Sequence, residues 1–380
     1  MSVLEQLGVR PIINAAGPVT RLGGHRIRSE VAEAMAQAAQ SHARIEDLQA
    51  RASALLSEAT GAEAGLVTSG AAGALFLASA ACLAGFDLAR MDALPAIGDG
   101  RAEIVVQRGH RNAYDHAIRA AGARFVEAGY LGHPGAGCTH PWQIEAAVTD
   151  RTVALAWPVM STPGTVDLST VSAIAHARGL PVIVDAAAAL PPRSNLRRFI
   201  AEGADLVAYS GGKAIGGPQA SGLLVGRRDL IQSATLQMLD MDVYREVWEP
   251  GKPLMEDGRI PGPPHHGIGR QCKVGKEQIV GLLTALRLFL AEDETIERQR
   301  WLARLETIQA SLRGVPGLDV AIRSSAAVPT CVVSVDRELV GMTAYDVIQA
   351  LEAGDPPVCV SQGLAAEGGL VINPTTLTDA

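Results

Sequence analysis

The stretch DLVAYSGGKAIGGPQASG, residues 205–222, places a lysine directly after an apolar run and between glycines. The run 205–209 predicts a buried β-strand, and the glycines predict a tight turn that carries Lys213. By itself, a lysine in such a turn is typical of a solvated loop. A P-loop does not fit, because Val207 stands where its first glycine should be and Ala214 replaces the magnesium-binding Ser or Thr.

A carboxylate follows an apolar strand earlier in the chain, in LPVIVDAAAAL, residues 180–190. Asp185 ends this strand, at the position where α/β proteins place their ligands. A buried carboxylate needs a partner, since burying it alone costs several kcal/mol. The protonated ring nitrogen of pyridoxal 5'-phosphate (PLP) is a suitable partner, and a helix cap or loop hydrogen bond is equally suitable.

The third motif is LVTSGAAGA, residues 66–74, in which a strand passes through small residues into a helix. Free N–H groups at a helix N-terminus bind anions, and small side chains let a phosphate approach. The motif lacks the third glycine of a dinucleotide fingerprint. In the order phosphate site, Asp185, Lys213, the three motifs predict a PLP site, with a lysine amine made reactive by burial.

These motifs resemble fold-type I PLP enzymes, and within them the family of bacterial selenocysteine synthase and D-glucosaminate-6-phosphate ammonia-lyase. The resemblance covers nearly the whole chain and extends to INAAG (13–17), GHRN (109–112) and GIGRQCKVGKE (267–277). It implies the aspartate-aminotransferase fold, an α/β large domain with a mainly parallel sheet plus a small C-terminal α+β domain. It also implies a homodimer or higher homo-oligomer.

Carried over by position, the family implies that Lys213 is the Schiff-base lysine and Asp185 the pyridinium partner. The residues implied for the cofactor phosphate are Ser69, Gly70, Ala71 and Ser210. His110 is implied over the ring face, with a surface loop histidine as the alternative. Arg270 is implied as a partner for the cofactor phosphate or a substrate carboxylate, within one subunit or across a subunit boundary. The alternative is a solvent-paired arginine at a helix start.

The resemblance implies a PLP-dependent lyase that converts a β-hydroxy or otherwise β-substituted amino acid into a 2-oxo acid and ammonia. Lys213 would remove the Cα proton, and Arg270 or Arg21 would bind the substrate carboxylate. His265 or His266 would protonate the leaving group, unless they are an ordinary loop pair. Aldol cleavage, racemisation, transamination and selenium-transferase-like group transfer stay open, because the sequence does not show which bond is aligned for cleavage. A non-catalytic PLP-binding regulator is a further alternative.

The composition of the chain limits the classes of partner that the protein is expected to bind. The 380 residues carry a formal net charge of -7 and no basic run, which disfavours nucleic acid and anionic membranes. The longest apolar stretch, 71–86, is shorter than the roughly 20 residues of a membrane span and predicts a buried helix. Five cysteines without a C-x-x-C pair predict neither disulfides nor a zinc site, and no other metal site is predicted. Without a secretory signal, the chain is expected in the cytoplasm.

Alternating strand and helix patterns over 65–225 predict the parallel sheet. We expect residues 1–45 to form an N-terminal arm and helix, and 46–265 the PLP-binding large domain. Residues 266–380 are expected to form a long linking helix and the small domain. Within the large domain, 239–264 breaks the alternation and is expected to be an ordered loop beside the substrate.

Overall fold

The computed structural model describes residues 2–98, 100–132 and 137–378, and every structural statement below refers to these. The chain divides into two compact units. The larger unit spans residues 28–286, and the smaller unit combines residues 1–27 with 287–380. The predicted boundaries near residues 45 and 265 stay a prediction.

A seven-stranded sheet forms the centre of the larger unit, in the order β2-β10-β9-β8-β7-β3-β4. Strand β10 runs antiparallel to both of its neighbours, and the other strands of this sheet all run in the same direction. The mainly parallel sheet predicted from the alternating pattern is therefore confirmed. The strands are β2 (Ala64–Thr68), β3 (Glu103–Gln107), β4 (Arg124–Ala128), β7 (Thr152–Pro158), β8 (Val182–Asp185), β9 (Leu206–Ser210) and β10 (Gly222–Gly226).

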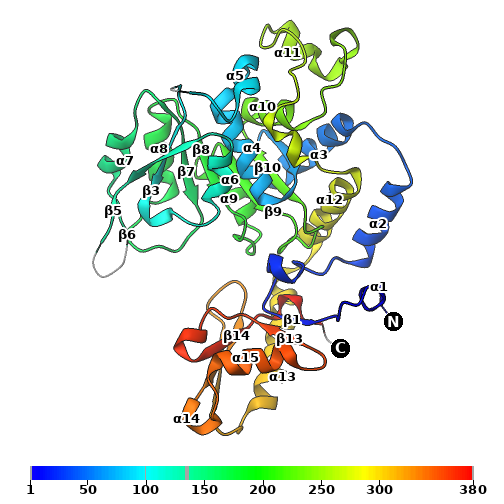
Figure 1. The fold of residues 1–380 in the computed structure, drawn as a ribbon, viewed down its shortest axis with the longest axis vertical. Helices are drawn as coiled ribbons and strands as arrows, with labels where there is room; N and C mark the ends of the chain where they lie inside the picture. Colours follow the sequence, from blue (N-terminus) through cyan, green and yellow to red (C-terminus); the bar gives the residue numbers. More distant parts are fainter. Residues whose placement is uncertain (1, 99, 133–136, 379–380) are drawn as a thin grey trace. The chain divides into compact units, whose positions relative to one another are not determined.

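Helices cover both faces of this sheet (Figure 1). One face carries α4 (Gly70–Ala84), α6 (Asp115–Ala120) and α10 (Arg228–Met238), and the other α3 (Ile45–Thr60), α7 (Pro141–Ala147), α8 (Leu168–His176) and α9 (Asn195–Ala201). The unit also contains α2 (Ser29–Ala39), α5 (Leu88–Ala93), the short pair β5 (Tyr130–Leu131) and β6 (Gly137–Cys138), and most of α12 (Lys276–Ala291).

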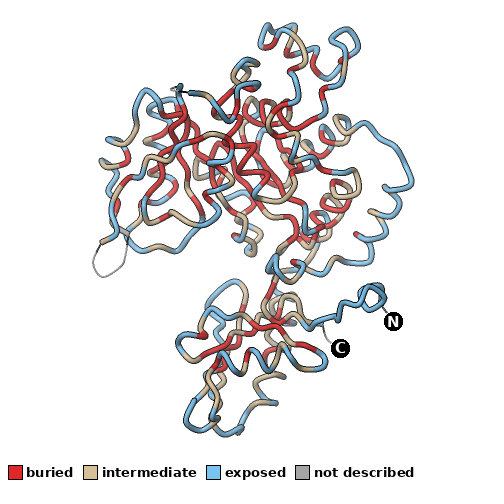
Figure 2. The backbone as a smooth tube through the Cα atoms, viewed as in Figure 1, coloured by how far each residue is buried: buried red, intermediate tan, exposed pale blue. Residues whose placement is uncertain are grey.

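Burial on both faces explains why the strands are continuous apolar runs instead of alternating ones. Every residue of β2, β3 and β10 is buried, and Figure 2 shows the central strands in red. Most of α4 is buried as well, as expected for the apolar stretch 71–86. Within the described residues, no helix is both long and apolar enough to cross a membrane.

Residues 239–264 contain only short helical turns, namely η3 (Arg245–Val247), η4 (Glu249–Gly251) and α11 (Lys252–Glu256). Trp248, Leu254 and Ile260 nevertheless pack into the hydrophobic core of the larger unit. The expected ordered loop is therefore present, and its buried side chains attach it to the unit. Its role as a substrate wall stays a prediction.

The smaller unit has its own sheet and core. Strands β11 (Leu318–Arg323), β12 (Thr330–Val335) and β14 (Gly369–Ile372) pair antiparallel, while β1 (Ile13–Ala15) pairs parallel with β13 (Val358–Val360). Its helices are α1 (Val3–Gln6), α13 (Glu294–Leu312), α14 (Arg337–Val340) and α15 (Ala344–Ala353). The small α+β domain predicted from the sequence is confirmed.

The long linking helix expected from about residue 273 past Leu290 is α12, and a second helix follows it. The first, α12, ends at Ala291, and α13 begins at Glu294. Asp293 separates them, because its side chain accepts hydrogen bonds from the backbone N–H groups of Thr295 at 2.8 Å and Ile296 at 3.4 Å. This is an N-cap, which starts a new helix.

Candidate active site

The predicted cofactor residues of the larger unit meet at one edge of its sheet. Strands β2, β3, β8 and β9 run in the same direction, so their carboxyl ends lie at the same edge. Ser69, His110, Asp185 and Lys213 follow or end these four strands. In open α/β sheets, this edge is where ligands bind.

Asp185 and Lys213 lie close enough to influence each other's protonation. Asp185 is aligned with Ala208 of β9, and Lys213 lies in the turn that follows this strand. One carboxylate oxygen of Asp185 accepts a hydrogen bond from the Ala187 N–H at 3.0 Å. Burial raises the pKa of the Asp185 carboxyl, and the Ala187 N–H and Lys213 oppose this shift. Burial also lowers the pKa of the Lys213 amine, opposed by Asp185.

Close backbone packing shapes the start of α4. An added Cβ at Gly222 would lie 2.4 Å from the carbonyl carbon of Gly70 and 2.7 Å from the Ala71 nitrogen. Gly70 itself has φ +79°, a conformation that favours glycine. Ser69 precedes the helix without a side-chain capping bond, and the first turn carries no acidic residue. The N–H groups at this helix start therefore suit an anion.

Ser210 and Cys272 border the same helix start. Ser210 is aligned with Gly222, and Gly222 is aligned with Thr68 on its other side. The Cys272 thiol is hydrogen-bonded to the Ser69 side chain, and burial raises the pKa of this thiol. Sequence reasoning did not single out Cys272, since a lone cysteine in a motif carries no signal by itself.

His110 is fully buried, so the surface-loop alternative is wrong. Its ring meets the Trp157 indole edge to face, with centroids 5.5 Å apart. Burial lowers the pKa of His110 to about 4, which keeps the imidazole neutral near neutral pH. Its Nδ1 faces the Gln107 amide at 3.5 Å, and its Nε2 has no hydrogen-bond partner among the described residues.

These features fit PLP. The glycine-lined start of α4 suits a phosphate, and the strand-end carboxylate of Asp185 suits a protonated ring nitrogen. Lys213 offers an amine with a lowered pKa. The unpartnered Nε2 of His110 is a buried polar atom that the protein alone does not satisfy, as expected where a ligand completes a site.

Arg270, predicted as an anion partner, lies on η5 (Ile268–Cys272), which contacts both α4 and α10. Its guanidinium binds the Asp240 carboxylate at 2.8 Å. The alternative of an arginine at a helix start that is paired only with solvent does not describe Arg270 fully, because Arg270 forms an ion pair with Asp240.

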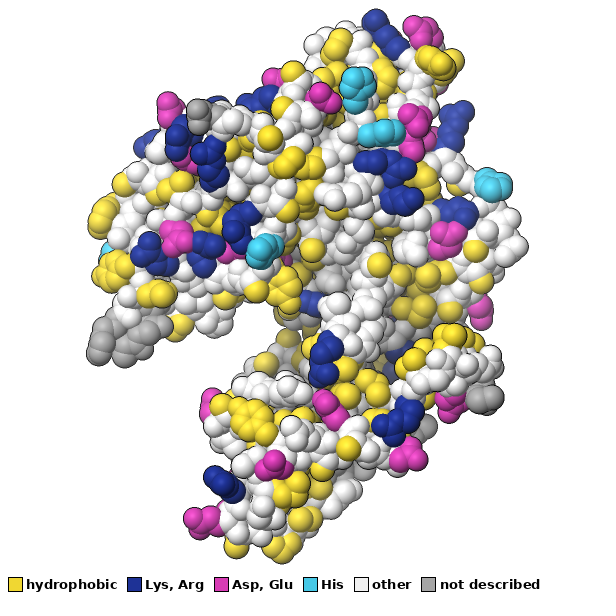
Figure 3. Space-filling view, viewed as in Figure 1, with side chains coloured by type: hydrophobic (Ala, Val, Ile, Leu, Met, Phe, Trp, Pro, Cys, Tyr) yellow, Lys and Arg dark blue, Asp and Glu magenta, His cyan; other side chains and the backbone are white. Residues whose placement is uncertain are grey.

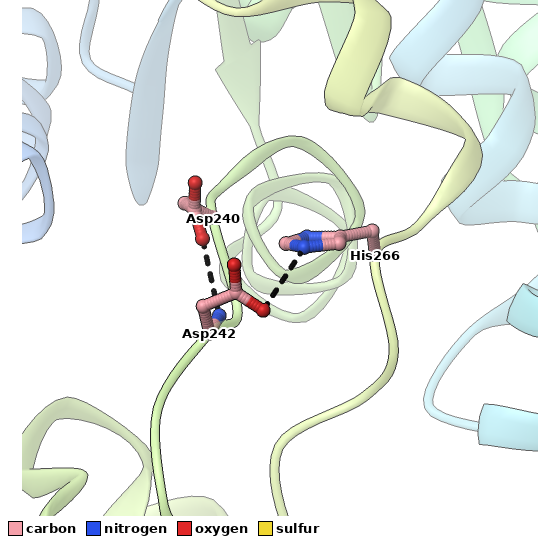
Figure 4. A group of neighbouring side chains, drawn as sticks. All are labelled: Asp240, Asp242 and His266. Atoms are coloured by element: carbon pink, nitrogen blue, oxygen red, sulfur yellow. Dashed lines mark hydrogen bonds and ion pairs between the residues drawn. The ribbon is translucent and has the colours of Figure 1, made fainter.

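His265 and His266 lie in different surroundings. The His265 side chain is 91% exposed and faces Asp92 at 3.6 Å. His266 faces Asp242 at 3.3 Å, and Figure 4 shows it beside both Asp240 and Asp242. Among the described contacts, neither histidine touches Lys213 or Asp185.

The His266, Asp240 and Asp242 group was not anticipated from sequence, because the residues come from both ends of the 239–266 segment. Their ligand atoms lie within 4.8 Å of one another, which is a distance at which such groups can share a cation. All three residues are exposed, and Arg270 already neutralises Asp240. The three residues and Arg270 therefore form an ion-pair network, which explains why they lie close together.

Arg21, the other predicted carboxylate partner, belongs to the smaller unit. Its side chain is 62% exposed and faces Glu352 of the same unit at 3.5 Å. Its role toward substrate stays a prediction.

Two residues near Asp185 were not predicted from the sequence as part of the site. Asp115 and Trp157 line a small cavity together with Asp185, although Asp115 starts α6 and Trp157 lies in β7. Only GHRN, which precedes α6, offered a signal in this region, and it drew attention to His110 instead.

The sequence is similar to characterised proteins over most of its length. The family model for L-seryl-tRNA selenium transferase matches residues 12–242. The chain is 34% identical to the 5'-C-glycyluridine monooxygenase-decarboxylase of Streptomyces sp, over 98% of this chain and 88% of that protein.

An ammonia-lyase is similar in both sequence and structure. The D-glucosaminate-6-phosphate ammonia lyase of Salmonella typhimurium is 30% identical, over 100% of this chain and 94% of that protein. The solved structure of D-glucosaminate-6-phosphate ammonia-lyase matches with a TM-score of 0.82 at 29% identity, covering 100% of this chain and 95% of that one.

Proposed function

The chain belongs to the L-seryl-tRNA selenium transferase family of fold-type I PLP-dependent enzymes, and from this we propose that it is a PLP-dependent lyase of the ammonia-lyase type. The family resemblance found in its motifs is thereby confirmed. The proposed substrate is a β-hydroxy or otherwise β-substituted amino acid, and the products are a 2-oxo acid and ammonia. The Lys213–Asp185 pair at the carboxyl edge of the sheet is the observation that carries this proposal.

Each predicted cofactor residue has a distinct task. When bound, PLP supplies an electron sink that stabilises negative charge at the substrate Cα. Ser69, Gly70, Ala71 and Ser210 would hold its phosphate. Asp185 would hold a proton on its ring nitrogen, and the neutral His110 would cover one face of the ring.

Lys213 is the proposed base. Burial lowers the pKa of its amine, so a larger fraction is neutral and able to accept the Cα proton. Its position beside Asp185 places that amine at the same sheet edge as the ring-nitrogen partner. The lowered pKa of the Lys213 amine and the raised pKa of the Asp185 carboxyl both favour the neutral form of these groups before the cofactor binds.

His266 and Arg270 are proposed as the acid for the leaving group and the partner of the substrate carboxylate. His266 is preferred to His265 as the acid, because its Nε2 lies 3.3 Å from the Asp242 carboxylate, which orients the ring. Arg270 would bind a carboxylate by exchanging its partner Asp240, and Arg21 is the second candidate. A homodimer or higher homo-oligomer in the cytoplasm completes the proposal.

Group transfer on seryl-tRNA is disfavoured by charge. The chain has a net charge of -7, and on the face in Figure 3 basic side chains are interspersed with acidic ones. A tRNA backbone is bound through clustered basic side chains. Salt-sensitive binding of seryl-tRNA would contradict this argument.

Loss of the Cα carboxylate is the second candidate reaction. The relative with 34% identity is named a monooxygenase-decarboxylase and is similar over 98% of this chain. The bond held perpendicular to the cofactor ring is the one cleaved, so the same site can favour loss of CO2 over loss of the Cα proton. The product distinguishes the two, because decarboxylation releases CO2 and β-elimination releases ammonia.

The test is a panel of D- and L-β-hydroxy amino acids, sugar-derived ones included, supplied to PLP-loaded protein. Ammonia, 2-oxo acid, CO2 and oxygen uptake are measured in parallel. We expect equal amounts of ammonia and 2-oxo acid from at least one substrate. CO2 release with oxygen uptake would favour loss of the Cα carboxylate. A change in the cofactor spectrum with release of neither ammonia nor CO2 would favour aldol cleavage or racemisation.

The matched variants are Lys213→Ala and Lys273→Ala. Lys273 is exposed and lies in the GIGRQCKVGKE motif. Removing the base should lower turnover by about 10^2- to 10^4-fold or more, while Lys273→Ala stays near the unaltered rate. Near-normal turnover in Lys213→Ala would end the proposal.

A further inference from the structure

Asp185 shares a small cavity with a second carboxylate, that of Asp115. The cavity has a volume of about 20 Å³, and Asn112 and Trp157 also line it. Such a space holds little more than one water molecule. Bulk solvent therefore screens the two carboxylates poorly, and the charge of Asp115 acts on the proton affinity of Asp185.

Asp115 is fixed by an ion-pair network that leads away from the cavity. It is only 7% exposed, and its carboxylate accepts a hydrogen bond from the Arg111 Nε. The Arg111 guanidinium also binds Glu127 and lies 5.1 Å from the centroid of the Phe125 ring. Arg108 holds the other oxygen of Glu127 at 2.8 Å. This arrangement holds the Asp115 carboxylate in one position.

Two charged groups act on Asp185 from neighbouring elements, Lys213 after β9 and Asp115 in α6. Burial is the main cause that raises the pKa of the Asp185 carboxyl, and the charge of Asp115 adds to it. The Ala187 N–H and Lys213 act in the opposite direction. Asp115 is thus the neighbouring charge that favours a retained proton.

We propose that Asp115, held by Arg111, is a positioning residue that strengthens the hold of Asp185 on the proton of the cofactor's ring nitrogen. The inference rests on the proposed PLP function and deepens it. A negative charge behind Asp185 stabilises the proton between this carboxylate and the ring. Arg111 limits the effect, because its cation partly neutralises Asp115. The two residues therefore set the proton affinity in opposite directions.

The experiment uses intact protein loaded with PLP that carries 15N at the ring nitrogen. A pH titration of the ring 15N signal gives the proton affinity of that nitrogen without any substrate. Asp115→Asn should lower the affinity about tenfold, a shift of about one pH unit, because one negative charge is lost. Arg111→Gln should raise the affinity, and Asp115→Glu should restore values near those of the unaltered protein.

Glu127→Gln is the matched control. It alters the outer end of the same network but leaves Asp115 and Arg111 in place, so the titration should move less than threefold. A structural role would lower the melting temperature of all variants and leave the ring titration unmoved, which would overturn the proposal. Shifts of equal sign in Asp115→Asn and Arg111→Gln would also overturn it. Failure of the unaltered protein to take up PLP would instead overturn the proposed function itself.

Discussion

His110 combines complete burial with an imidazole nitrogen that no described residue satisfies. Burial without a charged partner is the reason for its low pKa, because the charged form loses its hydration. A neutral ring in this position packs like an aromatic side chain. The same ring offers one polar atom to whatever completes the site.

This burial makes stability depend on pH. The pKa of His110 is lowered from 6.5 to about 4 in the folded chain. Between these values the unfolded chain binds a proton that the folded chain does not, so stability rises with pH and is lost on acidification. We expect a loss of roughly 3 kcal/mol from this group between pH 6.5 and 4.

Urea unfolding at several pH values in this window checks that expectation. His110→Phe keeps an aromatic ring beside Trp157 but has no proton to bind. The variant should lose less stability on acidification than the unaltered protein. Equal losses in both would show that His110 does not titrate across this window.

At the scale of elements, the start of α4 depends on how closely β10 approaches it. Gly222 lies between Thr68 and Ser210 in the sheet, and its missing Cβ leaves room for the backbone of Gly70 and Ala71. Because the opposing atoms belong to the backbone, they cannot rotate away. This packing fixes the position of the predicted phosphate site.

Gly222→Ala should therefore weaken PLP binding by roughly tenfold and destabilise the fold by about 1–3 kcal/mol through overpacking. Fluorescence titration with PLP and thermal unfolding measure the two effects. Gly262→Ala is the control, since its added Cβ would first meet the Arg245 Cδ at 3.8 Å, an ordinary contact. Unchanged PLP affinity in Gly222→Ala would argue against a phosphate site at α4.

For the whole molecule, the smaller unit depends on the first residues of the chain. Its core joins Ala15 with buried residues far away in sequence, among them Leu305, Val333 and Val360. Strand β1 pairs with β13, and the Ile13 N–H donates to the Pro357 carbonyl at 2.8 Å. The N-terminal segment is thus part of this unit's fold.

Removing residues 2–16 should speed hydrogen exchange of the β13 amides by about tenfold or more, because β13 loses its partner strand. Exchange in the seven-stranded sheet should change little, since that unit has a separate core. Mass spectrometry of peptides from both units measures this. Removing only residues 2–8, which are all exposed, is the control and should leave β13 protected.

The order of the chemically important residues along the chain, and the strands that they follow, could be predicted from the sequence. An apolar run that ends in Asp185, a second run followed by Lys213 and the small residues that open α4 predicted the cofactor class, and the alternating strand and helix patterns predicted the mainly parallel sheet. These signals are local, because each depends on a strand and the few residues after it.

Contacts between residues far apart in the chain could not be predicted from the sequence, and the folded structure shows them. The buried environment of His110, the cavity that Asp115 shares with Asp185, and the pairing of β1 with β13 all join segments far apart in the chain. It also brought His266 and Arg270 to the two aspartates of one exposed network. Such contacts depend on the packing of helices against a sheet, and residue spacing carries no record of that packing.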